Sequence, residues 1–356
     1  MSKTPAVLVC DARTASLKIA GLTVIDRLVV TAHRAGCAPI FVVCESPPPL
    51  ARAEALEIAV THITDVSAFQ QIREPMLWIE RTVFVEVRDL ANVVAMDGQL
   101  ISAESGPLPV RMTVAEPTPI IAGALAMAIS DAASAAEAER KLWASLTSTA
   151  DGLVDRFFNR PLGRPLSKLL AHTSISPNQV SLVSILIGVA SAWFFARGDF
   201  LTGALVFQLC AVIDCVDGDL ARALFKQSRL GKWLDLGGDQ LVHFSVFAAI
   251  GIGVARTNPS VPALALGASA ALGVLLCFAV IVRALRMLAP QRGPHLNKLL
   301  DATANRDFSV LLLVLALWGR MDLFLWMAGI GIHVFWVVLL ALQVGRPTPT
   351  ISRESI

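Results

Sequence analysis

Four aspartates lie between two long apolar runs in the segment "DCVDGDLARALFKQSRLGKWLDLGGDQ", residues 214–240. Asp214 and Asp217 are three residues apart, and Asp235 and Asp239 are four apart, so each pair projects from one face of a helix. An unpaired carboxylate beside a membrane-spanning run costs free energy, so these side chains need a cationic partner. We therefore expect the two pairs to converge on a bound cation.

The ligand atoms of this segment indicate which cation it would hold. Four facing carboxylates would repel one another and partly protonate unless a cation neutralised them. A ligand set made only of oxygen atoms favours a hard divalent ion, Mg²⁺ or Mn²⁺, over zinc, and such ions usually act on phosphates. Gly218 would leave room for a bulky ligand, and Arg222 could hold a pyrophosphate as an anion clamp.

The composition predicts a membrane protein built from two parts. The 356 residues have a mean hydropathy of +0.64, and only 16% are charged. Charged and apolar residues mix before about residue 140, whereas long apolar blocks alternate with polar loops further on. A net charge of +2, with no basic stripe interleaved with aromatics, excludes a nucleic-acid partner. We expect a soluble domain over 1–140, a linker with an interfacial helix over 141–177, a six-span domain over 178–344 and a cytoplasmic tail over 345–356.

Cysteines and the N-terminal segment indicate a reducing compartment. The six cysteines form no CxxC pair and lie mostly in apolar surroundings, which favours buried thiols over disulfides or a zinc site. The N-terminal "MSKTPAVLVC" has only a short apolar run and no evident cleavable signal peptide. The soluble domain is therefore expected in the cytoplasm.

Short β-rich runs alternate with a helix-like segment in the soluble part. The runs lie at 6–10, 39–44, 57–63 and 76–80, and an amphipathic stretch occupies 21–36. This alternation predicts an α/β domain with a parallel sheet.

The stretch "AVLVCDART…IAGLTVIDRLVVTAHRAG" resembles the nucleotidyltransferases that activate sugar or inositol phosphates. In that family a glycine-rich loop follows the first strand, and an aspartate after a later strand holds a metal. Here the loop "CDARTASLK" lacks glycine, and the later position offers Glu80. The resemblance therefore implies a degenerate, inactive nucleotidyltransferase-like domain. Arg13 and Lys18 are either remnants of a phosphate-facing loop or ordinary solvated charges.

Six apolar spans are expected in the membrane part. Lys and Arg gather in the second and fourth loops between them, so the positive-inside rule places these loops, both termini and the four aspartates on the cytoplasmic side. The fifth span is short for a bilayer. We include it because the distribution of Lys and Arg among the loops requires an even number of spans. The spans run at 179–196, 200–221, 236–255, 262–285, 304–319 and 322–343.

A basic and apolar segment, "LVDRFFNRPLGRPLSKLL" at 153–170, precedes the first span. Its cations alternate with large apolar side chains, which is typical of a helix lying on the membrane surface. A linker helix packed on the soluble domain is the alternative. The cations are Arg156, Arg160, Arg164 and Lys168, and the apolar residues include Leu153, Phe157, Phe158 and Leu169.

The aspartate segment is similar to the signature of the CDP-alcohol phosphotransferases, D-x-x-D-G-x-x-A-R followed by G-x-x-x-D-x-x-x-D. "SPNQVSLVS" at 176–184 adds the Pro-Asn that family members often carry before the first span. Together with the soluble domain, the arrangement resembles the inositol-phosphate cytidylyltransferase / di-inositol-phosphate phosphate synthase fusions. The fixed positions are filled by Asp214, Asp217, Gly218, Ala221, Arg222, Gly231, Asp235 and Asp239.

The resemblance implies a transferase that moves a substituted phosphate from a CDP-alcohol to an acceptor alcohol and releases CMP, in phospholipid or inositol phosphodiester synthesis. Asp214, Asp217 and Asp235 would bind two Mg²⁺ or Mn²⁺ ions, with Asp239 near the metals and acting as the base. A homodimer in the cell's inner membrane is implied as well. The CDP-alcohol would be bound by Asn178, Gly218, Ala221, Arg222 and Gly231.

Arginines near the fourth and fifth spans indicate a possible acceptor site. Arg283, Arg286 and Arg306 lie on the expected cytoplasmic side, where positive-inside topology alone accounts for most arginines. Arg283 still falls within an apolar run and needs a partner there. A polyol phosphate acceptor would supply one, since guanidinium groups bind phosphate bidentately.

Two other classes of membrane protein could use buried acids. An intramembrane prenyltransferase also binds a pyrophosphate through aspartate pairs and Mg²⁺, but its motifs lack the G-x-x-A-R and G-x-x-x-D-x-x-x-D sequences. A cation transporter would place its acids near the midplane of the bilayer rather than at the cytoplasmic ends of helices. Both are weaker alternatives.

Overall fold

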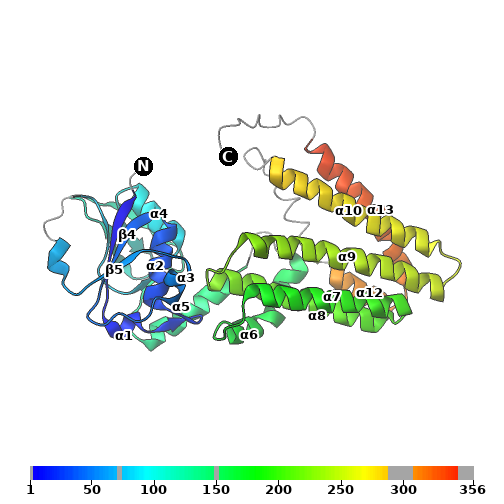
Figure 1. The fold of residues 1–356 in the computed structure, drawn as a ribbon, viewed down its shortest axis with the longest axis horizontal. Coiled ribbons are helices and arrows are strands. Elements are labelled where there is room, and N and C mark those ends of the chain that lie inside the picture. The colour runs from blue at the N-terminus through cyan, green and yellow to red at the C-terminus, as the bar shows by residue number, and fades with distance from the viewer. Residues whose placement is uncertain (1–2, 70–73, 148–151, 288–307, 344–356) are drawn as a thin grey trace. The chain divides into compact units, whose positions relative to one another are not determined.

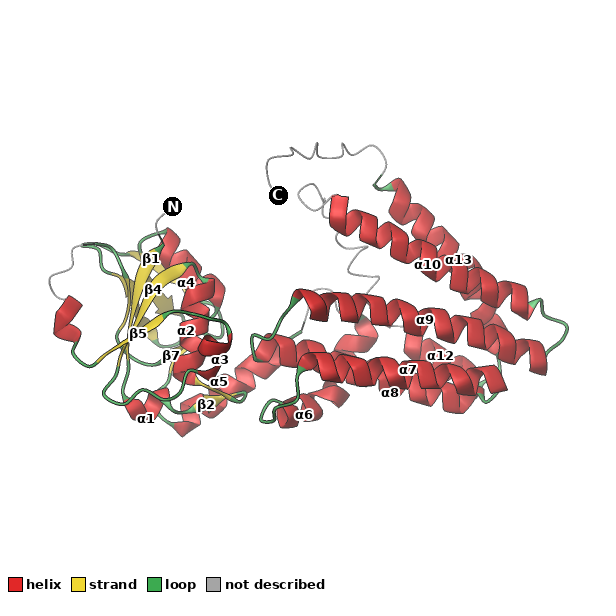
Figure 2. Cartoon of the chain, viewed as in Figure 1, coloured by secondary structure: helices red, strands yellow, loops and turns green. Residues whose placement is uncertain are grey.

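The computed structural model describes residues 3–69, 74–147, 152–287 and 308–343 (Figure 1). The chain divides into two compact units. The first comprises residues 1–146 with the short segments 171–173 and 223–225. The second comprises residues 147–170, 174–222 and 226–356. Strands occur in the first unit, and the described part of the second is helical (Figure 2).

A seven-stranded sheet forms the centre of the first unit, in the order β10-β8-β9-β6-β1-β4-β5. Its strands are β1 (Thr4–Val9), β4 (Cys37–Val43), β5 (Val60–Ile63), β6 (Leu77–Ile79), β8 (Gly98–Ser102), β9 (Gly106–Met112) and β10 (Thr118–Ile121). Two small two-stranded sheets pair β2 (Lys18–Ile19) with β3 (Leu22–Thr23) and β7 (Val83–Phe84) with β11 (Met127–Ala128).

The expected parallel sheet is only partly correct, because the sheet is mixed. β1 pairs in parallel with β4 and β6, as the alternating pattern predicts. β9 is antiparallel to both of its neighbours, β6 and β8. Only three residues, 103–105, connect β8 to β9, and a connection this short forms a hairpin and cannot be a crossover between parallel strands.

Helices cover the sheet of the first unit and bury its core. In α2 (Val24–Arg34) the Thr23 side chain caps the first turn by accepting a hydrogen bond from the backbone N–H of Asp26. Leu28, Val29 and the β1 residue Leu8 belong to one buried apolar cluster. The remaining helices are α1 (Ala12–Ala15), α3 (Ala51–Ala55), η1 (Val66–Phe69), α4 (Val87–Ala95) and α5 (Ala132–Ser145).

The described part of the second unit contains five helices long and apolar enough to cross a membrane, and one shorter apolar helix. The long helices are α7 (Pro177–Arg197), α8 (Phe200–Ala223), α9 (Arg229–Thr257), α10 (Ala263–Met287) and α13 (Met321–Ala341). The shorter helix is α12 (Phe308–Leu317), which falls within the expected fifth span. The upstream part of that span lies outside the described residues.

Close helix packing in the second unit depends on small residues and defined caps. Ser176 and Gln179 form a capping box at the start of α7, with Pro177 in the first turn. α9 packs against α7 on one side and α10 on the other. A Cβ atom on Gly251 of α9 would lie 2.8 Å from the Cα atom of Gly267 in α10, so the two backbones approach each other directly.

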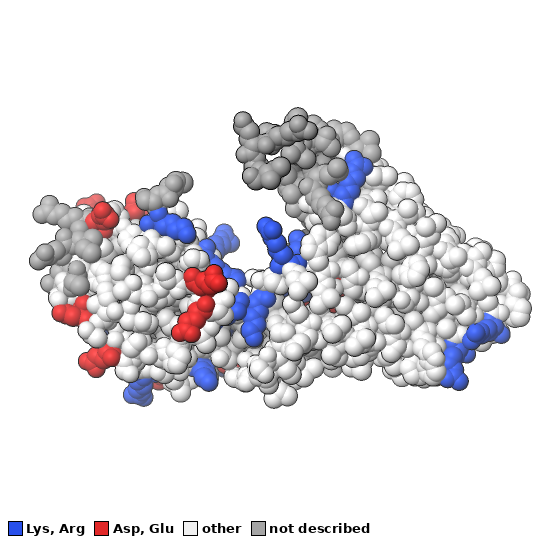
Figure 3. All heavy atoms as spheres, viewed as in Figure 1, with Lys and Arg blue, Asp and Glu red and all other residues white. Residues whose placement is uncertain are grey.

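The surface of the second unit is mainly uncharged, as expected for helices that face lipid. On the face drawn in Figure 3 its Lys and Arg side chains lie near the ends of the unit. Large apolar side chains are exposed along the long helices, among them Leu186, Trp193, Leu275 and Ile330. Such a surface suits a bilayer and would be unfavourable in water.

The basic segment before α7 folds as a π-helical turn η2 (Asp155–Asn159) followed by α6 (Arg160–Leu170). Its apolar side chains point outward, with Phe157 71% and Leu169 66% exposed. Arg160, in contrast, is buried. The four cations of the segment are therefore not equivalent: Arg160 belongs to the interior of the unit rather than to the membrane surface.

Candidate metal centre and nucleotide pocket

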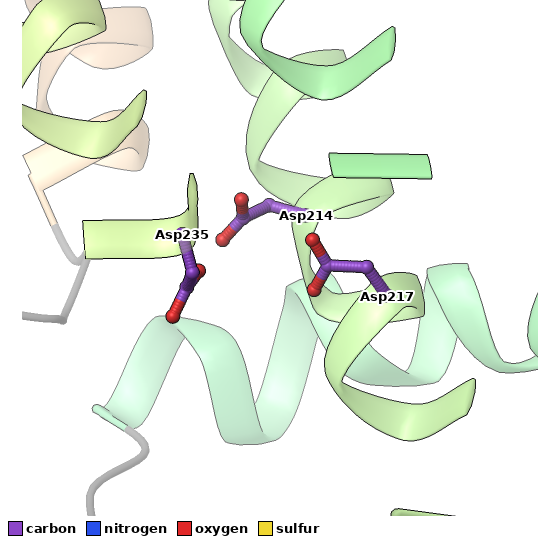
Figure 4. A group of neighbouring side chains, drawn as sticks. All are labelled: Asp214, Asp217 and Asp235. Atoms are coloured by element: carbon purple, nitrogen blue, oxygen red, sulfur yellow. The ribbon is translucent and has the colours of Figure 1, made fainter. Parts of the chain in front are cut away.

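Three of the four aspartates converge. Asp214 and Asp217 come from α8 and Asp235 comes from α9, and their carboxylates point toward one another (Figure 4). One oxygen from each lies within 4.8 Å of the others. Asp239 is buried one turn further along α9 and is not a member of this group of three.

The donor set of this group fits a hard divalent cation. All three groups are carboxylates, and no His or Cys belongs to the cluster that the described residues form. Oxygen ligands of this kind suit Mg²⁺ or Mn²⁺. Three negative charges at this spacing repel one another, and a bound divalent cation would relieve that repulsion.

Two serines on α7 hold the metal-facing carboxylates in place. The Ser181 hydroxyl donates a hydrogen bond to Asp217, and the Ser184 hydroxyl donates one to Asp214 Oδ1 at 3.3 Å. Both serines are buried. Their spacing of three residues in "SPNQVSLVS" places them on one face of α7, a pattern from which both could have been predicted. Hydrogen bonds of this type fix the orientation of metal ligands.

A cavity of about 470 Å³ opens beside the aspartates. Asp217 and Asp235 lie on its wall. Of the residues expected to bind the CDP-alcohol, the cavity wall includes Asn178, Gly218, Ala221 and Gly231. The wall also contains three cations that were not singled out from the sequence, Lys226, Arg229 and Lys232. They belong to the polar stretch between the two aspartate pairs, and they give one side of the cavity a positive charge suited to an anionic ligand.

The two signature glycines permit close contacts. A Cβ atom on Gly231 would lie 2.9 Å from Asn178 Oδ1, so a side chain at the start of α9 would displace the Asn178 amide at the start of α7. A Cβ atom on Gly218 would lie 3.2 Å from Arg222 Nη2. The space beside Gly218, which we expected a ligand to fill, is thus next to the Arg222 guanidinium.

The arginines expected to bind the acceptor are only partly described. Arg283 lies in α10 and is exposed. The side chain of Arg286 and all of Arg306 lie outside the described residues.

His243, one turn beyond Asp239, is buried against the rings of Phe247 and Phe308.

A second cavity, of about 680 Å³, lies in the first unit at the carboxyl ends of β1 and β6. Asp11 and Glu80 line it, whereas Arg13 and Lys18 are not among its lining residues. The Asp11 carboxylate accepts hydrogen bonds from the hydroxyl and backbone N–H of Thr14, which lower its pKa. Glu80 is paired with Arg111 at 2.9 Å. Both acids are therefore already engaged by protein groups.

Comparison with known proteins finds a family match over the part of the chain that contains the aspartates. Residues 174–339 match the family model for CDP-alcohol phosphatidyltransferase. The chain is 36% identical over 106 residues to the bifunctional IPC transferase and DIPP synthase of Thermococcus kodakarensis, covering 30% of this chain and 24% of that protein. It is 33% identical over 94 residues to the archaetidylinositol phosphate synthase of Pyrococcus horikoshii, covering 26% of this chain and 50% of that protein.

Two further similarities are to phosphatidylinositol phosphate synthases, one compared by sequence and one by structure. The phosphatidylinositol phosphate synthase of Streptomyces avermitilis is 34% identical over 97 residues, which cover 27% of this chain and 39% of that protein. The chain thus spans half or less of the length of these relatives. The crystal structure of Mycobacterium tuberculosis phosphatidylinositol phosphate synthase with CDP-DAG bound aligns with a TM-score of 0.40 and 21% identity, covering 55% of this chain and 100% of that chain. Residues 174–339, which match the family model for CDP-alcohol phosphatidyltransferase, contain all four aspartates.

Proposed function

We propose that the protein is an integral-membrane transferase that moves a substituted phosphate from a CDP-alcohol to the hydroxyl of an acceptor and releases CMP. The observation that supports this most directly is the carboxylate cluster of Asp214, Asp217 and Asp235, of which the last two line a cavity whose wall also carries three cationic side chains. Such a site can hold a pyrophosphate and a nucleotide together. The family match over residues 174–339 agrees with this reaction class.

The chain's own residues would share the chemistry in the following way. Asp214, Asp217 and Asp235 would hold divalent ions, two in number as the resemblance implies, which would neutralise charge on the pyrophosphate and on departing CMP. Gly218, Ala221, Gly231 and Asn178 would enclose the cytidine, and Arg222 would contact the pyrophosphate.

The proposed base is Asp239. It would take the proton of the acceptor hydroxyl while that oxygen bonds to the β-phosphorus and the bond from this phosphorus to the CMP oxygen breaks. Asp239 is 5% exposed and lies one helical turn beyond the metal ligand Asp235. At this position Asp239 would be close to the metals, and its carboxylate would remain available as a base because the three clustered aspartates bind the ions.

We further propose a lipid donor, a CDP-diacylglycerol or its ether analogue, and an inositol phosphate acceptor. Relatives are named phosphatidylinositol phosphate synthase and archaetidylinositol phosphate synthase, which supports this pairing. Arg283, Arg286 and Arg306 would bind the acceptor phosphate. A CDP-inositol donor with an inositol phosphate acceptor is the second candidate, because another relative is named a bifunctional IPC transferase and DIPP synthase.

We also propose a membrane topology, an oligomeric state and a role for the first unit. Six spans would place both termini, the first unit and the aspartates on the cytoplasmic side of the inner membrane. The chain would act as a homodimer through its membrane helices. The first unit would be a nucleotidyltransferase-like domain without activity, because its first loop lacks the glycines that bring backbone N–H groups to a triphosphate.

A substrate matrix tests the reaction class. The purified chain would be incubated with Mg²⁺ and a panel of radiolabelled CDP-alcohols crossed with neutral and phosphorylated acceptors, and the products would be identified by mass. We expect CMP release that depends on the acceptor, stops with chelator and returns with Mg²⁺ or Mn²⁺. Release of inorganic pyrophosphate from a prenyl diphosphate, or cation flux in vesicles without CMP release, would instead favour a prenyltransferase or a transporter.

A further inference from the structure

A buried ion-pair network connects α6 to the signature motif in α8. Asp219, at a position that the family signature leaves open, has a side chain only 1% exposed. Its Oδ1 atom accepts a hydrogen bond from Arg160 Nη1 at 2.6 Å and another from Arg222 Nη2 at 3.1 Å. The Ser167 hydroxyl reaches its other oxygen, Oδ2, at 3.4 Å. One carboxylate therefore connects the signature arginine of α8 to α6.

The backbone geometry makes this connection possible. A Cβ atom on Gly163 would lie 3.0 Å from the carbonyl oxygen of Val212 and 3.2 Å from Val216 Cγ2, so α6 lies directly against α8 at this point. Gly163 falls between Arg160 and Ser167 on the buried side of α6. Arg160, Gly163 and Ser167 of α6 thus face the protein, while Leu162 and Leu169 are exposed.

The position of the Arg222 guanidinium links the network to the proposed donor site. Both terminal nitrogens of Arg222 would be within 3.3 Å of a Cβ atom on Gly218, and Gly218 lies on the cavity wall next to Asp217. The Arg222 side chain is 30% exposed, so it can still meet a ligand. A long arginine side chain loses rotamer entropy when a ligand fixes it, and an anchoring carboxylate reduces that loss.

The charges in this network allow Asp219 to hold the Arg222 side chain in place without cancelling its positive charge. Arg160, Arg222 and, by electrostatic attraction, Arg164 all act on the single Asp219 carboxylate. The shorter contact is with Arg160, so Asp219 is compensated mainly by that partner. Arg222 is thereby held in place but keeps positive charge that can act on a phosphate.

We propose that Asp219 is a positioning residue for the donor pyrophosphate: it holds the Arg222 guanidinium over Gly218, and Arg160 of α6 supports it. The proposal rests on the proposed function, since it assigns Arg222 to the CDP-alcohol. A role in stability alone would be the competing explanation, because breaking a buried ion pair destabilises a protein in any location.

The experiment compares Asp219→Asn, Asp219→Glu and the double variant Arg160→Gln/Asp219→Asn in the full-length chain. Removing only Asp219 takes away one charged partner of the buried Arg160 and endangers folding, whereas the double variant removes both charges of the pair. Asp322→Asn is the matched control, since Asp322 also pairs with an arginine, Arg320, at 3.1 Å but lies at the start of α13 outside the proposed site. Melting temperatures are measured for every variant.

The first measurement is steady-state kinetics with donor and acceptor varied separately. We expect Asp219→Asn to raise the KM for the CDP-alcohol about tenfold and to leave the KM for the acceptor nearly unchanged. The double variant should match Asp219→Asn in its donor KM, because Arg160 acts through Asp219. Asp219→Glu should recover part of the loss, and Asp322→Asn should behave as wild type.

The second measurement is calorimetric binding of CDP in the presence of Mg²⁺, which needs no turnover. We expect the dissociation constant for CDP to change in the same order as the donor KM: raised in Asp219→Asn and in the double variant, partly restored in Asp219→Glu, and unchanged in Asp322→Asn. A donor KM and a CDP affinity that remain at wild-type values in the double variant would refute the positioning role, as would equal effects on donor and acceptor that follow the melting temperature. Wild-type protein that binds CDP but releases no CMP would contradict the proposed function alone, and the binding series would still decide the role of Asp219.

Discussion

The hydroxyl of Ser181 in α7 donates a hydrogen bond to the carboxylate of Asp217 in α8, so a residue outside the signature orients one of the candidate metal ligands. Both residues line the cavity beside the aspartate cluster. The contact joins the first two long helices of the second unit at the place where the metal would sit. It suggests that α7 contributes to metal binding although it supplies none of the three clustered carboxylates.

Ser181→Ala is expected to weaken metal binding about 10- to 100-fold, the usual effect of losing a hydrogen bond to a metal ligand. The measurement is the Mg²⁺ concentration that gives half-maximal CMP release. Ser191→Ala is the control, because Ser191 is also buried in α7 but its hydroxyl bonds the carbonyl oxygen of Gly188 in its own helix. An unchanged Mg²⁺ requirement in Ser181→Ala would show that Asp217 needs no such support.

Asp239→Asn is expected to abolish turnover while metal and donor binding remain largely intact, because a carboxamide fills the same space but cannot accept a proton. Asp214→Asn should instead weaken the binding of both metal and donor, since Asp214 belongs to the clustered group. Turnover and calorimetric binding are measured for each variant. Full activity of Asp239→Asn across a pH series would rule out its role as the base.

Gly231→Ala is expected to raise the KM for the donor without a large change in melting temperature. The added methyl group would meet the end of the Asn178 side chain, which can move, and Asn178 lines the cavity. Gly237→Ala in the same helix meets no atom within 4 Å and should bind the donor as wild type does. Its melting temperature should rise slightly, since alanine favours a helix by about 1 kcal/mol over glycine. Equal donor constants in the two variants would contradict the contact.

Arg283→Gln is expected to raise the KM for the acceptor and leave that for the CDP-alcohol nearly unchanged, because the arginine would bind the acceptor phosphate. The assay varies inositol phosphate and donor independently. Equal effects on both substrates, or saturation of the wild type by unphosphorylated inositol, would eliminate the phosphate-binding role. Arg197→Gln at the other end of a span, where the guanidinium stacks on Trp193, is a suitable control for loss of an exposed charge.

The first unit is expected not to make a CDP-alcohol. The full-length chain carrying Asp239→Asn, in which the second site is silenced, should release no pyrophosphate from CTP and inositol phosphate. The physical reason is that the loop after β1 contains no glycine to bring backbone N–H groups to a triphosphate, and the Asp11 carboxylate already accepts hydrogen bonds from Thr14. Steady pyrophosphate release by this variant would mean that the domain has kept its activity.

The sequence by itself determined what depends on local periodicity. The spacing of Asp214 from Asp217 placed both on one face of α8, and the apolar runs located the long helices to within two residues, except that α9 begins at Arg229, seven residues before the expected span. The β-rich runs likewise gave β1, β4, β5 and β6. These features follow from neighbouring residues, because helix and strand geometry repeat over a few positions.

Only the tertiary structure decided which distant residues meet. It grouped Asp235, but not Asp239, with the α8 pair, and it turned Arg160 inward to Asp219 although its segment is typical of a membrane surface. It also inserted β9 antiparallel between β6 and β8. Such contacts depend on the angle and depth at which separate helices and strands pack, and these are set by side-chain volume across the whole unit rather than by spacing along the chain.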